Sequence, residues 1–199
     1  MIKISKENLR SQNDQFELEE HLSILQRILL NSDGTMTNLL EEMLQEDLYA
    51  HKIFEDISPS TEDLPMLALT EGQPIWRRMI TLQGKHSGLN YLYADSLIAQ
   101  DNLDKEFADT LLNTGTPIGK IWELFRVETY KSLDEWGEEP AGNLADLFSI
   151  DQTDMLLFRT YRVFSQKKPV MQITEKFPKQ WFLDGSLIRK QQQASVGAY

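Results

Sequence analysis

The sequence contains no cysteine among its 199 residues. A disulfide framework, a thiolate nucleophile and a thiolate metal site are therefore excluded. Positive charge is also scarce: lysine and arginine total 20, against 31 aspartates and glutamates, which gives a formal net charge of −11. Because nucleic-acid binding needs a basic surface, this balance argues against nucleic acid as a partner. The lack of cysteine agrees with a reducing compartment, and we expect a cytoplasmic protein.

Long apolar runs are missing too. The longest are only a few residues, far short of the roughly 20 residues that a membrane-spanning helix needs. The N-terminus, Met1 to Lys6, has neither a long apolar run nor a small-residue cleavage pattern, which argues against a secretory signal. We therefore expect no membrane partner.

Several common site motifs are absent as well. The three histidines, His21, His51 and His86, are far apart and lack metal-ligand spacing. There is no Gly-x-Ser-x-Gly elbow, phosphate-binding loop or dinucleotide fingerprint. The sequence gives no reason to expect a metal or a cofactor.

The apolar residues that are present follow two periods. A period of about 3.6 residues is typical of an amphipathic helix, and a period of two is typical of a strand. Helical periods occur over residues 16–29, 36–44, 103–112, 118–125 and 144–148. Strand-like runs occur over residues 48–57, 74–82, 89–98, 127–136, 155–164 and 169–177. The pattern predicts an α+β domain, with a single antiparallel sheet of about six strands and helices on one side.

The length is enough for one sizeable domain and does not require a second. We expect a flexible N-terminal segment over residues 1–15 and the folded domain over residues 16–178. Residues 179–199, which include a glutamine run, are expected to form a poorly ordered C-terminal tail.

Glu175 is the most informative single residue. In a strand it shares one face with Met171, Ile173 and Phe177. A carboxylate among apolar neighbours either finds a cationic or hydrogen-bonding partner or takes up a proton. Groups in that condition are frequent in catalytic and ligand-binding sites. Glu175 is therefore a candidate site residue.

Arginines in two strands are candidate partners. Arg77 and Arg78 lie on opposite faces of an apolar strand, so either one of them points inward or both extend to water along the sheet. An inward arginine suits carboxylate recognition because its planar fork donates two parallel hydrogen bonds. A structural ion pair between Arg159 or Arg162 and Glu175, across the last hairpin, is the competing interpretation. Residue-level reasoning thus reaches a small-anion site of arginine and glutamate.

Five short motifs occur in a fixed order and resemble those of the chorismate lyase family. The similarity is greatest to the branch found in archaea, cyanobacteria and plastids, and it covers roughly residues 16 to 178. The motifs are Thr35-Met36-Thr37, Trp76-Arg77-Arg78, Thr116-Pro117-Ile118-Gly119-Lys120, Arg159-x-Tyr161 and Ile173-Thr174-Glu175-Lys176-Phe177-Pro178.

This resemblance implies a six-stranded antiparallel sheet whose helical flaps close over a buried ligand. It also implies an activity that removes pyruvate from chorismate and leaves 4-hydroxybenzoate, without a metal or redox cofactor. Arg78 would hold the ring carboxylate. Glu175 would meet the hydroxyl end, either as an acid towards the leaving oxygen or by orienting the hydroxyl. Met36 and Ile118 would enclose the ring, and Ala94 would line the pocket.

One departure from the family pattern is Asp95, where the bacterial form carries a cation. The group that meets the second carboxylate of chorismate is then open, and Arg159 is the candidate. The resemblance also suggests a role in quinone biosynthesis, and we expect a monomer or weak homodimer.

Two alternatives remain. The same fold resembles the effector-binding domains of bacterial transcription regulators, so the chain could be a non-catalytic binder of aromatic carboxylates. It could also be a related lyase with a different substrate or product isomer.

Overall fold

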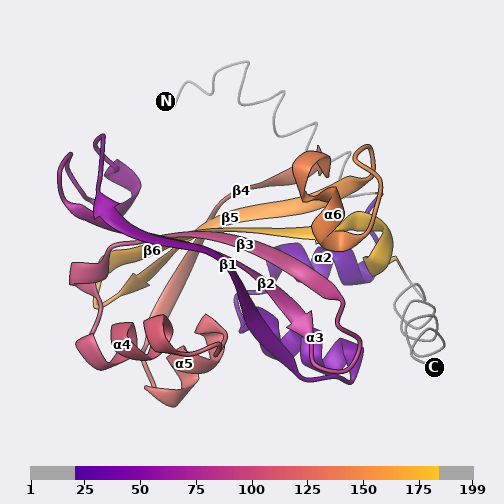
Figure 1. The fold of residues 1–199 in the computed structure, drawn as a ribbon, viewed down its shortest axis with the longest axis horizontal. Coiled ribbons are helices and arrows are strands. Elements are labelled where there is room, and N and C mark those ends of the chain that lie inside the picture. Colours follow the sequence, from indigo (N-terminus) through magenta and orange to yellow (C-terminus); the bar gives the residue numbers. More distant parts are fainter. Residues whose placement is uncertain (1–20, 184–199) are drawn as a thin grey trace, which may run out of the picture.

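The computed structural model describes residues 21–183, and its centre is a six-stranded antiparallel sheet (Figure 1). The strand order is β1-β2-β3-β6-β5-β4. The strands are β1 (Leu48–Pro59), β2 (Pro74–Gly84), β3 (Asn90–Ile98), β4 (Thr129–Pro140), β5 (Met155–Ser165) and β6 (Lys168–Pro178). Each coincides with a strand-like run of the sequence, and the predicted α+β class is confirmed.

The last hairpin shows how the local sequence sets the pairing. β5 and β6 are joined by Gln166 and Lys167, both with positive φ, as a two-residue turn that matches the twist of the strands requires. The turn aligns Ser165 with Lys168, and an irregularity between Val163 and Phe164 shifts the register by one residue, so that Arg159 lies directly opposite Glu175. Directly opposed residues of antiparallel strands share a face of the sheet. Glu175 and Arg159 therefore point to the same side.

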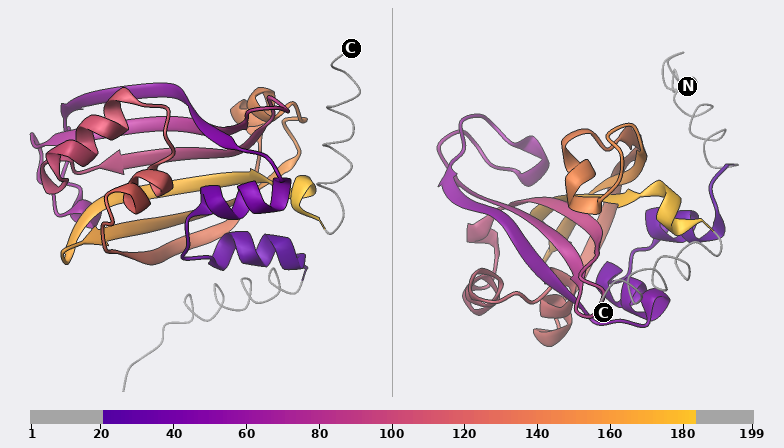
Figure 2. Two further views of the ribbon diagram at one scale, coloured as in Figure 1. Left: turned by 90° about the horizontal axis from the view of Figure 1, so that it is seen from below. Right: turned by 45° about the vertical axis from the view of Figure 1, so that its right-hand side comes forward.

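Short helices cover the sheet. They are α2 (Ile24–Asn31), α3 (Met36–Leu44), α4 (Lys105–Asn113), α5 (Ile118–Leu124) and α6 (Ala145–Phe148), with single turns of 3₁₀-helix at η1 (Pro65–Leu67), η2 (Gln100–Asn102), η3 (Gly142–Leu144) and η4 (Lys179–Phe182). Helices α2 to α5 lie on one face, as the view from below shows (Figure 2). The prediction of helices on one side is confirmed for these four. The short α6 packs against η4, where Phe148 contacts Trp181, and Trp181 also contacts Tyr91 of β3.

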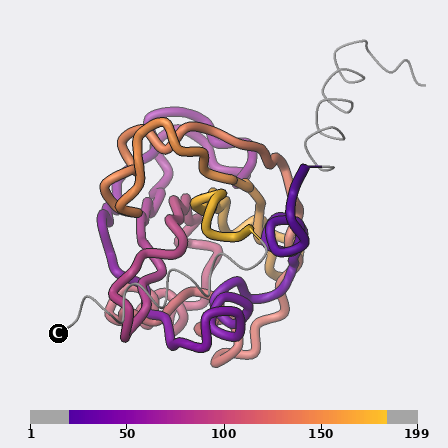
Figure 3. The backbone as a smooth tube through the Cα atoms, turned by 90° about the vertical axis from the view of Figure 1, so that its right-hand side faces the viewer, coloured from indigo at the N-terminus to yellow at the C-terminus, as the bar shows by residue number. Residues whose placement is uncertain are grey.

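The predicted tail begins too early. Trp181 and Phe182 are buried, and η4 is tied to α2, beside which it lies in the end-on view (Figure 3). The Ser23 hydroxyl, which caps α2, donates to the Phe182 carbonyl over 2.6 Å, and the Gln26 amide donates to Lys179 over 2.8 Å. The folded domain therefore continues past Pro178. Residues 1–20 and 184–199 lie outside the described range, and with them the predicted N-terminal segment over residues 1–15 and the predicted start of the domain at residue 16.

The main core lies between the sheet and its helices, and it includes apolar residues of all four large helices and of β1, β2, β3, β5 and β6. Among the helices of residues 21–183, none combines the length and apolarity that crossing a membrane requires.

Candidate active site

A cavity lies between the helix-covered face of the sheet and the starts of α3 and α5. It holds about 580 Å³ of space between atoms, mouth included, but the centre of a water molecule can reach only about 50 Å³ of it. The interior of the cavity is thus narrow in this structure. Its lining consists of Thr35, Met36, Thr37, Arg78, Ile80, Leu82, Leu92, Ala94, Ser96, Pro117, Ile118, Gly119, Trp122, Lys131, Tyr161, Val163, Ile173 and Glu175. Five of the six predicted site residues are in this set, and Arg159 is not.

Strand register brings Arg78 and Glu175 into one cavity without contact between them. Arg78 lies opposite Ser96 of β3, and Glu175 lies opposite Ala94 of the same strand. Because β3 separates β2 from β6, the two backbones are about 10 Å apart, at about 4.8 Å for each strand spacing. An aromatic ring can be placed between side chains at that separation. A direct Arg78–Glu175 pair, which would have argued against a site, is not observed among the described contacts.

Arg78 is the inward arginine of its strand. Only 3% of its side chain is exposed, and its Nε and Nη2 atoms have no hydrogen-bond partner among residues 21–183. The nearest carboxylate oxygen, on Glu55 of β1, is 3.7 Å away, which is too long for a hydrogen bond. Burial lowers the pKa of the Arg78 guanidinium, and the charge of Glu55 opposes this shift. The site therefore contains a desolvated cation with unused donors.

The neighbouring residues on the other face behave differently. Arg77 is half exposed and pairs with Asp95 over 2.7 Å. The alternative in which both arginines extend to water is therefore wrong for Arg78 and holds only for Arg77. Asp95 faces away from the cavity and contributes no group to it.

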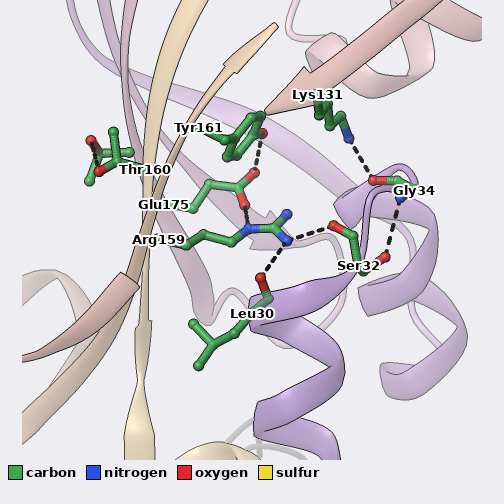
Figure 4. A network of polar contacts seen from close by, with 9 residues as sticks. Leu30, Ser32, Gly34, Lys131, Arg159, Thr160, Tyr161 and Glu175 are labelled. Atoms are coloured by element: carbon green, nitrogen blue, oxygen red, sulfur yellow. Dashed lines mark hydrogen bonds and ion pairs between the residues drawn. The ribbon is translucent and has the colours of Figure 1, made fainter. Parts of the chain in front are cut away.

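Glu175 is buried and fully engaged by neighbouring side chains (Figure 4). Its Oε2 atom accepts a hydrogen bond of 2.7 Å from Arg159 Nε, and its Oε1 atom accepts one of 2.9 Å from the Tyr161 hydroxyl. Burial first, and then the charge of Glu175, raises the pKa of Tyr161 well above its ordinary value, so the phenol stays a donor. The ion pair predicted across the hairpin is present between Arg159 and Glu175, and Glu175 also lines the cavity. The two interpretations of Glu175 are compatible.

Arg159 binds Glu175 from the side that does not line the main cavity. Its Nη1 atom donates to the Ser32 carbonyl over 2.7 Å and to the Leu30 carbonyl over 3.5 Å, in the connection from α2 to α3 (Figure 4). It lines a second cavity, which it shares with Tyr161 and Lys131. The structure therefore does not bring Arg159 to the wall of the main cavity, where the second carboxylate was expected to meet it.

Met36 and Ile118 begin the two helices that cover the cavity. The helices are joined at this point, because Thr35 and Asn38 both donate to the Glu123 carboxylate, over 2.9 and 2.7 Å. Gly119 makes the close approach possible: a β-carbon there would lie 2.3 Å from Thr35 Cγ2. The residues expected to enclose a ring do lie at the cover of the cavity.

Sequence reasoning gave no role to Tyr161 or to Lys131, which both line the cavity. Tyr161 belongs to a quoted motif but received no role. Lys131 of β4 drew no attention, because its neighbours Tyr130 and Ser132 are not part of an apolar alternation. Its position becomes clear only from the register that sets it opposite Val163. Among the described residues, no group of acidic, histidine or cysteine side chains is arranged to hold a metal ion.

Comparison with known proteins agrees with this geometry. Residues 30–183 match the family described as Chorismate pyruvate-lyase Rv2949c-like. The chain is 32% identical over 160 residues to a chorismate pyruvate-lyase of Mycobacterium leprae (strain TN), which covers 79% of this chain and 76% of that relative.

Among solved structures, PhnF from Mycobacterium smegmatis is similar with a TM-score of 0.59 and 11% identity, over 74% of this chain and 65% of that chain. The chain thus spans slightly less than two thirds of that protein. The separately solved effector domain of PhnF gives a TM-score of 0.58 and 11% identity, over 75% of this chain and 91% of that domain. At such low identity these two matches establish the fold alone.

Proposed function

The chain belongs to the Rv2949c-like chorismate pyruvate-lyase family, and from this we propose that it removes pyruvate from chorismate to leave 4-hydroxybenzoate. The observation that carries the proposal is Arg78, a buried guanidinium at the cavity whose Nε and Nη2 donors have no hydrogen-bond partner among residues 21–183. Burying such donors without partners costs free energy. A ligand carboxylate would satisfy two of them at once.

In the proposed complex, the ring carboxylate of chorismate lies on Arg78 and its 4-hydroxyl lies on Glu175. Both oxygens of Glu175 already accept hydrogen bonds, from Arg159 and Tyr161. The group is therefore arranged as an acceptor, which favours orientation of the hydroxyl over the role of an acid. Met36 and Ile118 would cover the ring.

The main task of the protein in this reaction is to position the substrate. The C3–O bond breaks, C4 loses its hydrogen as a proton, and the released enolpyruvate takes up a proton to become pyruvate. The six-membered ring becomes aromatic, so the step is downhill overall. The protein has to hold the diene in a reactive conformation and stabilise charge on the leaving oxygen. Fixed donors in a narrow, mostly apolar cavity suit both tasks.

A direct assay tests the proposal. The purified protein is incubated with chorismate, and released pyruvate and hydroxybenzoate are quantified together. We expect equal amounts of pyruvate and 4-hydroxybenzoate. Binding of 4-hydroxybenzoate without turnover would indicate a ligand-binding domain, and release of another isomer would indicate a sister lyase.

Three finer points also stay predictions. We propose that the product supplies quinone biosynthesis, that the protein acts in the cytoplasm, and that it is a monomer or weak homodimer. Sedimentation of the purified chain tests the last of these.

A further inference from the structure

Lys131 is a cationic residue of the cavity lining that has no assigned ligand group in the proposed complex. It lies on β4 opposite Val163, and both side chains line the main cavity. Its amine donates a hydrogen bond of 2.7 Å to the Gly34 carbonyl and lies 5.6 Å from the centre of the Tyr161 ring (Figure 4). Lys131 thus stands beside the Tyr161–Glu175 end of the cavity.

The charges that line this cavity are unequal. Arg78 and Lys131 are its cations and Glu175 is its anion. Glu175 is already paired with Arg159 over 2.7 Å. The amine of Lys131 donates its hydrogen bond to a neutral acceptor, the Gly34 carbonyl. Two cations at the wall thus face a ligand that, in the proposed reaction, carries two carboxylates.

Burial is unfavourable for the ammonium of Lys131. It lowers the pKa of Lys131, while Glu175 raises it, Arg159 lowers it and Asp33 raises it. The attraction of the two acids does not outweigh the loss of water. A carboxylate ligand would supply the missing counter-charge.

The geometry of chorismate indicates which carboxylate this is. Its enolpyruvyl group is on C3, next to the C4 that bears the hydroxyl. When the hydroxyl is at Glu175 and the ring carboxylate is at Arg78, the C3 substituent must lie near the neighbours of Glu175. Tyr161 and Lys131 are such neighbours, whereas Arg159 lies behind the carboxylate.

We infer that Lys131 binds the carboxylate of the enolpyruvyl group, and that it gives up its hydrogen bond to Gly34 in order to do so. The inference rests on the proposed function. Gly34 precedes α3, the helix that begins with Met36 over the cavity. Substrate binding would therefore break the Lys131–Gly34 hydrogen bond that links β4 to the start of α3. This hydrogen bond would form again once pyruvate has left.

A consequence is that Lys131 distinguishes substrate from product. Chorismate has the second carboxylate and 4-hydroxybenzoate lacks it. Arg78 contacts the carboxylate that the two molecules share. Loss of Lys131 should weaken chorismate alone, and loss of Arg78 should weaken both ligands.

The test compares Lys131→Met, Lys131→Arg and Lys176→Met in the full chain. Lys176 is the matched control, because it lies next to Glu175 on β6, points to the other face and pairs with Glu139. We measure kcat/KM and KM for chorismate, and Kd for 4-hydroxybenzoate by titration. For Lys131→Met we expect the KM for chorismate to rise roughly tenfold or more, with the Kd for 4-hydroxybenzoate unchanged within about twofold. Lys131→Arg should recover part of the loss, and Lys176→Met should resemble the unchanged protein.

The result that overturns the inference is an unchanged KM in Lys131→Met, or an equal loss of affinity for both ligands. Retained binding of 4-hydroxybenzoate shows that the variant is folded. If the unchanged protein releases no pyruvate from chorismate, the proposed function fails. The contribution of Lys131 is then still decided by the Kd values for chorismate and 4-hydroxybenzoate.

Discussion

The Tyr161 hydroxyl donates a hydrogen bond of 2.9 Å to the Glu175 carboxylate at the wall of the ligand cavity. The two residues lie on neighbouring strands, offset by two positions, since Tyr161 is opposite Ile173 and Glu175 is opposite Arg159. Arg159 holds the other oxygen of the carboxylate. The plane of Glu175 is therefore fixed from two sides before any ligand arrives, as a preorganised acceptor requires.

Replacing Tyr161 with phenylalanine should reduce catalysis more than it reduces stability. The ring remains, while Glu175 loses a donor, and a hydrogen bond to a charged group is worth about 1.5–3 kcal/mol. We expect kcat/KM for chorismate to fall roughly tenfold or more, measured as initial pyruvate release. Tyr130→Phe is the control, since Tyr130 is 69% exposed on β4. Full activity in Tyr161→Phe would mean that the hydroxyl serves only the fold.

Replacing Arg78 with methionine should separate binding from stability. Because its Nε and Nη2 atoms have no hydrogen-bond partner in the described part of the chain, little protein–protein hydrogen bonding is lost and the cost of burying a cation is removed. We expect the affinity for 4-hydroxybenzoate to fall by about 2–5 kcal/mol. The free energy of unfolding without ligand should stay the same or increase.

Arg77→Met is the matched control for this change. Arg77 is adjacent in sequence, half exposed and paired with Asp95 on the opposite face. Its exposed ion pair is screened by solvent and contributes little, so ligand affinity should not change. Equal loss of affinity in the two variants would contradict the assignment of Arg78.

The fold was predictable because its signals are local. Strand alternation and helical period depend on residues within one element, and they located all six strands of the sheet. The same alternation singled out Glu175 and the pair Arg77 and Arg78, since a charge on an apolar face is visible in the sequence itself, and the family resemblance then selected Arg78 to act with Glu175. The positions of both in one cavity agree with that expectation.

What sequence could not provide depends on contacts between distant segments. Lys131 reaches the cavity through pairing of β4 with β5, and an irregularity between Leu133 and Glu135 shifts that register. Trp181 is buried by Tyr91 and Phe148, which lie far away in the chain. Nothing in the local pattern of either segment carries this information.

Replacing Glu175 with glutamine tests its two roles. Arg159 would lose its charge partner in a buried setting, which costs about 3 kcal/mol of stability when one member of a buried pair is removed. Adding Arg159→Met should restore at least part of the free energy of unfolding, measured by denaturant titration, without restoring activity.

The remaining activity of Glu175→Gln distinguishes the chemical roles of this side chain. The amide oxygen can still accept from the 4-hydroxyl, so an orienting role leaves reduced but measurable pyruvate release. An acid role leaves none above background. Full turnover at every pH would exclude both roles.

Gly119 allows α5 to approach Thr35 at the start of α3. One substitution can disrupt this contact, and a second can restore it. A β-carbon at Gly119 would lie 2.3 Å from Thr35 Cγ2, although its distances to Thr35 Cβ and Oγ1 are 3.4 and 3.5 Å. Thr35 cannot rotate freely, because its hydroxyl donates to Glu123 over 2.9 Å. We expect Gly119→Ala to cost about 1–3 kcal/mol of stability through overpacking and to lower kcat/KM by displacing the cover of the cavity.

Thr35→Ser removes the clashing methyl group and keeps the hydroxyl. The double variant Gly119→Ala/Thr35→Ser should therefore recover both stability and kcat/KM, while Thr35→Ser alone should have little effect. Recovery would show that the distance between α5 and the start of α3, and no other property of Gly119, limits activity. If the double variant is as impaired as Gly119→Ala, the close contact with Thr35 does not control closure.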